Sequence, residues 1–423
     1  MNDTDDLQAA INKANNGDTI VATKSFLIKS TVTVPENKTI TLTGENITVQ
    51  PDKNFTGPLF TVEKDATLCL DGTITYKCQN LANGVFAQVK GDLILKNGTI
   101  SRLSSGKTNT GVIDVDGGSF TMKGGTISDI TASGANFGAV YIHKNDTYGT
   151  FSMEDGTISK FKSTNQYAGP VVVNGGSMTM SGGTIDGNTA TEFNSAGGVL
   201  VNTDSTFTMT GGTISNNSAK RGGGVLVREN GQFKMPKNSK GMISGNTAQV
   251  QSSSIEKPNA GGGGVFVEDN ALFEMEDGTI TRNTTNGMGG GVATAVLNEG
   301  DKTGGGQFHM TGGTISKNEA SCGGGVYSWS GKDRVVLEGG NIVNNTAYNQ
   351  GGGVYVSTSP YGLTIKNALI TDNKAKIMGG GVWACPTGTV TLGTDSAVFD
   401  NTAEKAGDDI ALLNKNEGYY STF

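Results

Sequence analysis

Four charged residues in two neighbouring repeats have the types and spacing needed to act on a glycan. Arg228 and Glu229 follow the segment GGGVLV, and Glu268 and Asp269 follow GGGVFV one repeat later. In stacked repeats Glu229 and Asp269 would lie within roughly 5 Å, which would raise the pKa of one carboxyl group. Glycoside hydrolysis uses two carboxyl groups across a sugar bond, and a lyase uses a base near acids. These four residues are the candidate catalytic group, although REN and EDN are also ordinary turn sequences.

Metal and cofactor chemistry has weaker support in the sequence. His143 and His309 lie several repeats apart, so they cannot form a metal pair and no zinc site is expected. The segment DVDGG at 114–118 would suit calcium, but two aspartates with glycines are also common in turns. The four cysteines have no metal-type spacing, and a disulfide between Cys69 and Cys78 stays open. We therefore predict no cofactor.

The elements that would position these residues follow from a repeat of about 28 residues. The segment FTMTGGTISNNSAKRGGGVLV at 207–227 returns as FHMTGGTISKNEASCGGGVYS at 308–328. Aligned on the isoleucine of GTI, the repeats begin near Ile20 and end near Val398, which gives about fourteen coils. The repeat therefore fills the chain.

Within each repeat, apolar residues alternate with a period of two, as in Phe207 and Met209 or Val225 and Val227, so the repeats are built of strands. A unit of three short strands cannot bury its own inner face, but stacked units can. The predicted fold is an all-β, right-handed parallel β-helix, because parallel crossovers are right-handed in most cases. The Asn column of the repeats is expected to be structural, because an inward amide can satisfy backbone groups at turns; its members are Asn188, Asn217, Asn246, Asn283, Asn318, Asn345, Asn373 and Asn401.

The ends of the chain complete the predicted domain. Residues 5–14 place Leu7 and Ile11 on one helical stripe, and Asp5 with Gln8 has the spacing of a capping box. We predict a single domain over 1–423, with a helical cap at 1–20, coils at 20–412, and a tail or linker at 413–423. Any export signal or anchor would lie outside this segment.

Composition excludes several classes of partner. The formal net charge is -7, and no cluster of lysine and arginine occurs, so nucleic acid is not an expected ligand. No run of 18 apolar residues occurs, so no membrane insertion is expected in this segment. Glycine accounts for 65 of 423 residues without a collagen period, and regular apolar residues between the glycines argue against disorder.

An outward stripe and three insertions are the candidate binding features. If the valines of GVxV point inward, the residue between them points outward and forms a stripe along the repeats. The predicted ligand-binding surface consists of His309, on a neighbouring strand, and of this stripe: Leu200, Leu226, Phe266, Tyr327, Tyr355 and Trp383. The alternative is that these side chains pack on one another or are covered by loops. Extra residues occur at 143–150, 248–260 and 295–306, and loops on a rigid scaffold often carry binding.

The pairing of GGGV or GGVL with ISNN, ISGN, ISKN and IVNN, from about 90 to 403, resembles the short motifs of polymorphic outer membrane proteins. It is also similar to the repeats of other adhesin-like and pectate-lyase-like β-helices. The chain differs from the outer membrane family in having Ile where an aromatic residue is usual. The resemblance implies a bacterial surface or secreted protein that adheres to a host protein or glycan, with immunoglobulin and mucin as candidate partners.

We therefore predict a binding protein and not an enzyme, with a polysaccharide lyase or glycoside hydrolase as the alternative. A more distant alternative is an ice-binding surface made by outward residues such as Thr213, Ser215 and Thr314. Met242, Asn341 and other residues interrupt that column, which favours ordinary surface residues of strands.

Overall fold

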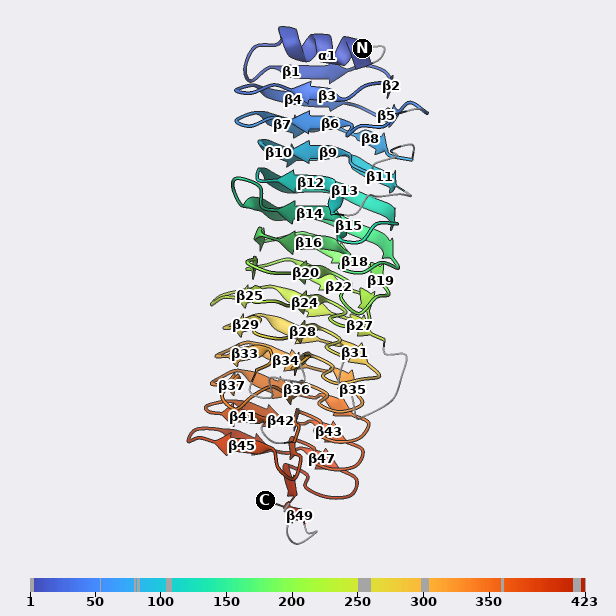
Figure 1. Ribbon diagram of the computed structural model, residues 1–423. Helices are drawn as coiled ribbons and strands as arrows, with labels where there is room; N and C mark the ends of the chain where they lie inside the picture. Colours follow the sequence, from blue (N-terminus) through green and yellow to red (C-terminus); the bar gives the residue numbers. More distant parts are fainter. Residues whose placement is uncertain are drawn as a thin grey trace. The chain divides into compact units, whose positions relative to one another are not determined.

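The chain folds into an all-β parallel β-solenoid of about 13 turns with one short helix at its N-terminal end (Figure 1). The computed structural model describes residues 4–53, 55–79, 81, 84–103, 109–249, 260–297, 304–358, 361–413 and 420–422. The chain divides into two compact units, the first comprising Met1–Asn194 with Ser205–Phe207 and the second Ser195–Asp204 with Thr208–Phe423. The predicted fold class is confirmed, and the predicted number of turns was close.

Unit 1 holds the helix α1 (Thr4–Lys13) and the strands that follow it. These strands are β1 (Thr19–Ala22), β2 (Phe26–Ile28), β3 (Val32–Val34), β4 (Thr39–Gly44), β5 (Ile47–Pro51), β6 (Phe60–Val62), β7 (Thr67–Leu70), β8 (Ile74–Lys77), β9 (Ala87–Val89), β10 (Asp92–Leu95), β11 (Thr99–Leu103), β12 (Thr110–Asp116), β13 (Ser119–Ala132), β14 (Phe137–His143), β15 (Gly149–Ser163), β16 (Gly169–Asn174), β17 (Gly176–Met180), β18 (Thr184–Asp186) and β19 (Thr189–Ala190).

Unit 2 consists of shorter strands; β21 (Thr206–Met209) has residues in both units. Its strands are β20 (Val199–Val201), β22 (Thr213–Ser215), β23 (Ser218–Ala219), β24 (Val225–Val227), β25 (Gln232–Met235), β26 (Met242–Ser244), β27 (Thr247–Ala248), β28 (Val265–Val267), β29 (Leu272–Met275), β30 (Thr279–Thr281), β31 (Thr284–Thr285), β32 (Val292–Ala295), β33 (Gln307–Met310), β34 (Thr314–Ser316), β35 (Glu319–Ala320), β36 (Val326–Trp329), β37 (Val335–Leu337), β38 (Asn341–Val343), β39 (Thr346–Ala347), β40 (Val354–Val356), β41 (Gly362–Ile365), β42 (Leu369–Thr371), β43 (Lys374–Ala375), β44 (Val382–Ala384), β45 (Thr389–Leu392), β46 (Ala397–Phe399), β47 (Thr402–Ala403), β48 (Ile410–Leu413) and β49 (Tyr420–Thr422).

A turn of unit 2 contains four strands where the sequence predicted three. In the turn from β25 to β28 the additional strand is β27, whose two residues directly follow Asn246 of the Asn column. Each strand pairs in parallel with its equivalent one turn later, for example β25 with β29 and β28 with β32. Phe233, Met235 and Ile243 point inward and are fully buried, as the period of two predicted.

Helix α1 covers the N-terminal end of unit 1, as predicted (Figure 1). Its own residues Leu7 and Ile11 are buried. The Gln8 amide donates to the carbonyl of Thr33 at 3.0 Å and accepts from its backbone N–H at 2.8 Å, which satisfies the free edge of β3. Lys38 Nζ donates to the carbonyls of Ile11, Asn12 and Ala14 at the end of the helix. The side chain of Asp5, and with it the predicted capping box, lies outside the described residues.

The Asn column forms a continuous hydrogen-bonded ladder within unit 2, which confirms its structural role. Asn283 Nδ2 donates to the carbonyl of Ile243 at 3.0 Å and to Asn318 Oδ1 at 3.0 Å. Its Oδ1 accepts from the backbone N–H and the Nδ2 of Asn246 at 3.0 and 2.9 Å. The ladder ends at Asn401, which donates to Asp409. Each buried amide thereby satisfies backbone groups that the corner between strands leaves open.

The C-terminal segment adds one difference. Strand β48 continues the parallel stack by pairing with β44, and β49 pairs with it antiparallel, within the segment predicted as a tail. No helix among the described residues is long and apolar enough to span a membrane.

Candidate functional site

The stripe predicted to face solvent is buried, so that prediction was wrong. Its six members are between 0 and 8 % exposed: Leu200, Leu226, Phe266, Tyr327, Tyr355 and Trp383. His309, the seventh predicted ligand-binding residue, is half-buried on β33, where it pairs in register with Glu274 of β29. The stripe is therefore an internal layer and offers no surface to a partner.

The backbone before four strands of the stripe lies close to the outward residues Phe266, Tyr327, Tyr355 and Trp383. The glycine three residues before the inward Val or Ile of each strand in this stack, from Gly222 to Gly407, has a φ of +56° to +68°, a backbone conformation that favours glycine. A Cβ on Gly351 would stand 2.9 Å from the Cβ of Tyr355, so only glycine fits there. The guanidinium of Arg221 lies 5.6 Å from the centre of the Phe266 ring and adds to these contacts.

Of the three insertions, the structure describes one completely. Residues 250–259 and 298–303 of the other two insertions lie outside the described residues. The insertion at 143–150 forms a tight hairpin, in which Lys144 and Tyr148 pair antiparallel and the Asn145 N–H donates to the carbonyl of Thr147 at 3.1 Å. Thr147 Oγ1 donates to the carbonyl of Gly117 at 2.6 Å, which anchors the hairpin on the preceding turn.

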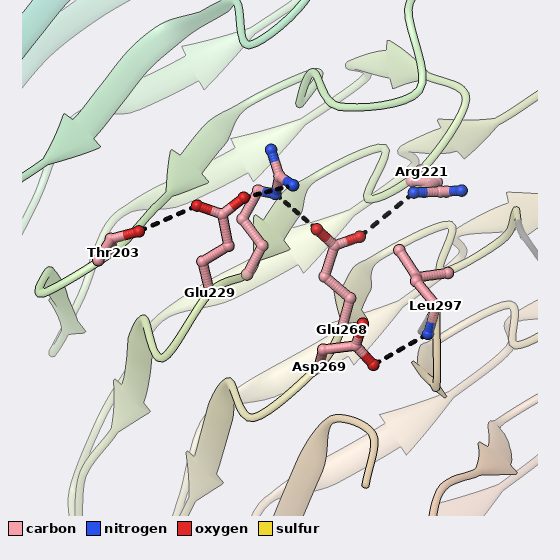
Figure 2. A network of polar contacts seen from close by, with 7 residues as sticks. Thr203, Arg221, Glu229, Glu268, Asp269 and Leu297 are labelled. Carbon is pink, nitrogen blue, oxygen red and sulfur yellow. Dashed lines mark hydrogen bonds and ion pairs between the residues drawn. The ribbon is translucent and has the colours of Figure 1, made fainter. Parts of the chain in front are cut away.

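Two residues of the predicted catalytic group, Arg228 and Glu268, form a buried ion-pair network with Arg221 in unit 2 (Figure 2). Glu268 Oε1 lies 2.5 Å from Arg228 Nε, and Glu268 Oε2 lies 3.2 Å from Arg221 Nη1. All three side chains are less than a tenth exposed. Arg228 also contacts Glu229 at 2.7 Å, and Thr203 Oγ1 donates to the same carboxylate at 3.0 Å.

Burial controls the electrostatics of this network. It raises the pKa of the Glu268 carboxyl, an effect that the charges of Arg228 and Arg221 oppose. Burial also lowers the pKa of Arg221, and the charge of Glu268 opposes that change. The network is a structural unit, because removal of Glu268 would leave two buried guanidinium groups without the carboxylate that they share.

Glu229 and Asp269 do not form the facing pair that the sequence predicted. Figure 2 shows that Glu229 points toward Thr203, whereas Asp269 accepts a hydrogen bond from the backbone N–H of Leu297 at 2.9 Å. Asp269 thus holds the chain where the second long insertion begins. The four residues predicted as a catalytic group share one region of unit 2, but their described contacts are structural.

A polar groove in unit 1 is a better candidate site. It has a volume of about 440 Å³ and lies beside the hairpin 143–150. Its charged and aromatic lining residues are Lys64, Asp65, Lys90, Asp92, Asp116, Asp146 and Tyr148. Tyr148 is 52 % exposed, and the Lys144 ammonium lies 4.5 Å from the centre of its ring. The groove therefore combines a held aromatic ring with carboxylates, amines and hydroxyl groups.

Behind one wall of this groove an imidazole lies between two carboxylates. Because β12 and β14 pair with Asp114 opposite Tyr141 and Asp116 opposite His143, these four side chains share the outer face of the sheet. His143 Nε2 lies 3.2 Å from Asp114 Oδ1, in an orientation that is poor for a hydrogen bond, and His143 Nδ1 lies 3.7 Å from Asp116 Oδ1. Asn174 donates to the Tyr141 hydroxyl at 3.1 Å.

The contact between Asp114 and His143 affects the pKa of both groups. Burial raises the pKa of Asp114, and the neighbouring His143 opposes this. Burial by itself would lower the pKa of His143, but contact with Asp114 and the charges of Asp114 and Asp116 outweigh it, so that the pKa is raised. Perturbed titratable groups beside a groove are typical of functional sites.

Sequence reasoning singled out DVDGG only as a turn or calcium segment and set His143 aside. The signal that would have found the cluster is the repeat spacing of 27 residues, which places Asp116 beside His143. Among the described residues, no group of three or more His, Cys, Asp or Glu side chains could hold a metal ion. All four cysteines are free, so Cys69 and Cys78 are not bonded to each other.

Comparison with known proteins adds no relative to this picture. No protein-family model matches the chain, and neither a curated protein nor a solved structure matches it. The fold and the geometry of its sites are therefore the basis for a functional proposal.

Proposed function

We propose that this chain is an adhesin-like bacterial binding protein, secreted or on the cell surface, and that it recognises a glycan in the groove beside Tyr148. The observation that carries the proposal is the exposed Tyr148 ring, held by an inserted hairpin over a polar groove of about 440 Å³. Sugar rings present apolar C–H faces to aromatic rings and hydroxyl groups to polar side chains, and such a groove supplies both kinds of contact.

The charges of the groove favour a neutral or amine-bearing glycan. Four aspartates and two lysines line it, and Lys90 is paired with Glu63 at 3.2 Å. A sulfated or uronate-rich chain would meet this acidic surface with like charge. Mucin and immunoglobulin are candidate partners, because both carry glycans. Direct protein recognition has less support, because the apolar stripe that would have carried it is buried.

Tyr148→Ala tests the proposal against the matched variant Phe193→Ala. Phe193 is an exposed aromatic residue of unit 1 that does not line the groove. Binding of each protein to immobilised mucin glycans would be measured by surface plasmon resonance. Loss of the ring should weaken binding roughly tenfold, as removal of a central aromatic contact commonly does, and Phe193→Ala should leave it unchanged. Equal affinities for the two variants would refute the proposal.

A glycoside hydrolase that uses Asp114 and Asp116 is the second candidate. What favours it is the placement of Asp114 and Asp116 on one face of β12, with Asp116 in the groove lining and the pKa of Asp114 raised by burial, since glycan hydrolysis needs one protonated and one ionised carboxyl group. Asp116→Asn should then abolish the release of reducing ends from a neutral polysaccharide, whereas Glu229→Gln should not. Without any release by the unmodified protein, this candidate is lost.

A further inference from the structure

Unit 2 carries a second groove around an exposed tyrosine. Tyr348 is 54 % exposed and donates a hydrogen bond from its hydroxyl to Glu319 Oε2 at 2.6 Å. The groove beside it has a volume of about 600 Å³, within the range of ligand-binding pockets. It lies entirely within unit 2 and shares no residue with the groove of unit 1.

Two columns of side chains form the groove, one on the two-residue strands and one just after them. Thr247, Thr284 and Glu319 stand in register on β27, β31 and β35. Two residues further along the chain in each turn, Gln249, Asn286, Ser321 and Tyr348 line the other side. Because these strands are paired turn by turn, the spacing between successive side chains is fixed at about the 4.8 Å distance between paired strands.

The ring of Tyr348 is held in place before any ligand arrives. A phenol that donates to a carboxylate makes a charge-assisted hydrogen bond, which restricts rotation of the side chain. The backbone of Tyr348 is also fixed, because its N–H donates to the carbonyl of Ala320 at 2.9 Å. An ordered aromatic side chain loses little conformational entropy when it binds, which favours recognition.

We propose that this groove is a second carbohydrate-binding site, with the apolar face of a neutral sugar on the Tyr348 ring. Glu319 is the only charged residue among the described lining residues, so an anionic glycan would be repelled and a neutral one would not. Carboxylate, amide and hydroxyl groups accept and donate the hydrogen bonds that sugar hydroxyls need. The ligand class rests on the proposed function, but the site itself is independent of the groove in unit 1.

Fluorine NMR of the full chain labelled with fluorotyrosine reports on the two grooves separately. The Tyr348 and Tyr148 signals would be assigned with Tyr348→Phe and Tyr148→Phe. The probes are cellotriose and triacetylchitotriose, with trigalacturonate as the anionic control. We expect the Tyr348 signal to shift with at least one neutral trisaccharide, to do so equally in Tyr148→Ala, and not to respond to trigalacturonate.

The possible outcomes separate the two proposals. A shift of the Tyr148 signal alone overturns the second site and leaves the proposed function standing. A shift of the Tyr348 signal alone supports the second site and removes the support for the first. If neither signal moves with any probe, both proposals fail, and a response to trigalacturonate as strong as to the neutral sugars contradicts the charge argument.

Glu319→Gln tests the role assigned to the carboxylate. This variant keeps the shape of the side chain but weakens the hydrogen bond that orients Tyr348, and it should weaken neutral trisaccharide binding roughly tenfold at this site. Its control is Glu338→Gln, which removes a carboxylate of unit 2 that pairs with Lys366 at 3.1 Å and does not line the groove. Equal affinity in the two variants would overturn the assignment.

Discussion

The Asn ladder makes a sharp prediction about the stability of unit 2. In Asn283→Ala, the buried amide loses the two hydrogen bonds that it donates and the two that it accepts. The carbonyl of Ile243 and the backbone N–H of Asn246 then remain in the interior without these partners. At about 0.5–1.5 kcal/mol for each hydrogen bond, with a further cost for buried groups left unsatisfied, the expected loss is about 3–6 kcal/mol.

The control is Asn341→Ala, which removes the same side chain from an exposed, outward position of β38 in the same unit. An exposed substitution of this kind should change the free energy of unfolding by less than about 0.5 kcal/mol. Both variants therefore change the composition equally, and they differ only in burial and hydrogen bonding.

Tryptophan fluorescence during urea unfolding is a suitable assay. Both tryptophans of the chain, Trp329 and Trp383, belong to unit 2, so the signal reports on that unit alone. Asn283→Ala should lower the urea midpoint far more than Asn341→Ala does. Equal midpoints for the two variants would show that the ladder does not stabilise the stack, and the account of the Asn column given above would be refuted.

Three further predictions concern charged and titratable groups. Glu268→Ala should lower the free energy of unfolding of unit 2 by about 3–5 kcal/mol in the same assay, because it leaves two buried guanidinium groups without their shared carboxylate. Glu229→Ala removes a carboxylate that is 51 % exposed and should lower it by less than about 1 kcal/mol. His143 should titrate above its ordinary pKa of 6.5 by proton NMR, and Asp114→Asn should lower that value. Because the folded pKa is raised, the charged imidazole stabilises unit 1 fully below pH 6.5, and this contribution is lost as the pH rises through the folded pKa; a flat profile would contradict the ion-pair geometry. Three of the four cysteines are buried and Cys385 is half-buried, so Ellman's reagent should react rapidly with Cys385 alone in the native protein and with all four in urea.

The repeat pattern was enough to predict the fold and its supporting columns. Apolar residues with a period of two, such as Phe233 and Met235, indicate strands with one buried face. Because each repeat is too small to bury that face alone, the repeats must stack in parallel. The Asn column and the helix that contains Leu7 and Ile11 followed from local chemistry, because a buried corner needs hydrogen-bond partners and an open stack needs a cover. Even so, the two-residue strand after each Asn was missed, because two residues carry no periodicity.

The surface of the molecule depended on contacts that no local pattern contains. Alternation shows that Tyr355 points away from the inner core, but the backbone at Gly351, which has a positive φ, lies close to its Cβ, and the side chain is buried. In the same way, Asp116 and His143 are ordinary polar residues 27 positions apart until the register of β12 and β14 brings them together. The burial of inward residues can be predicted from the sequence, because their apolar types repeat with the period of the strand. The burial of outward residues depends on which segments pack over them, and only the tertiary structure decides that.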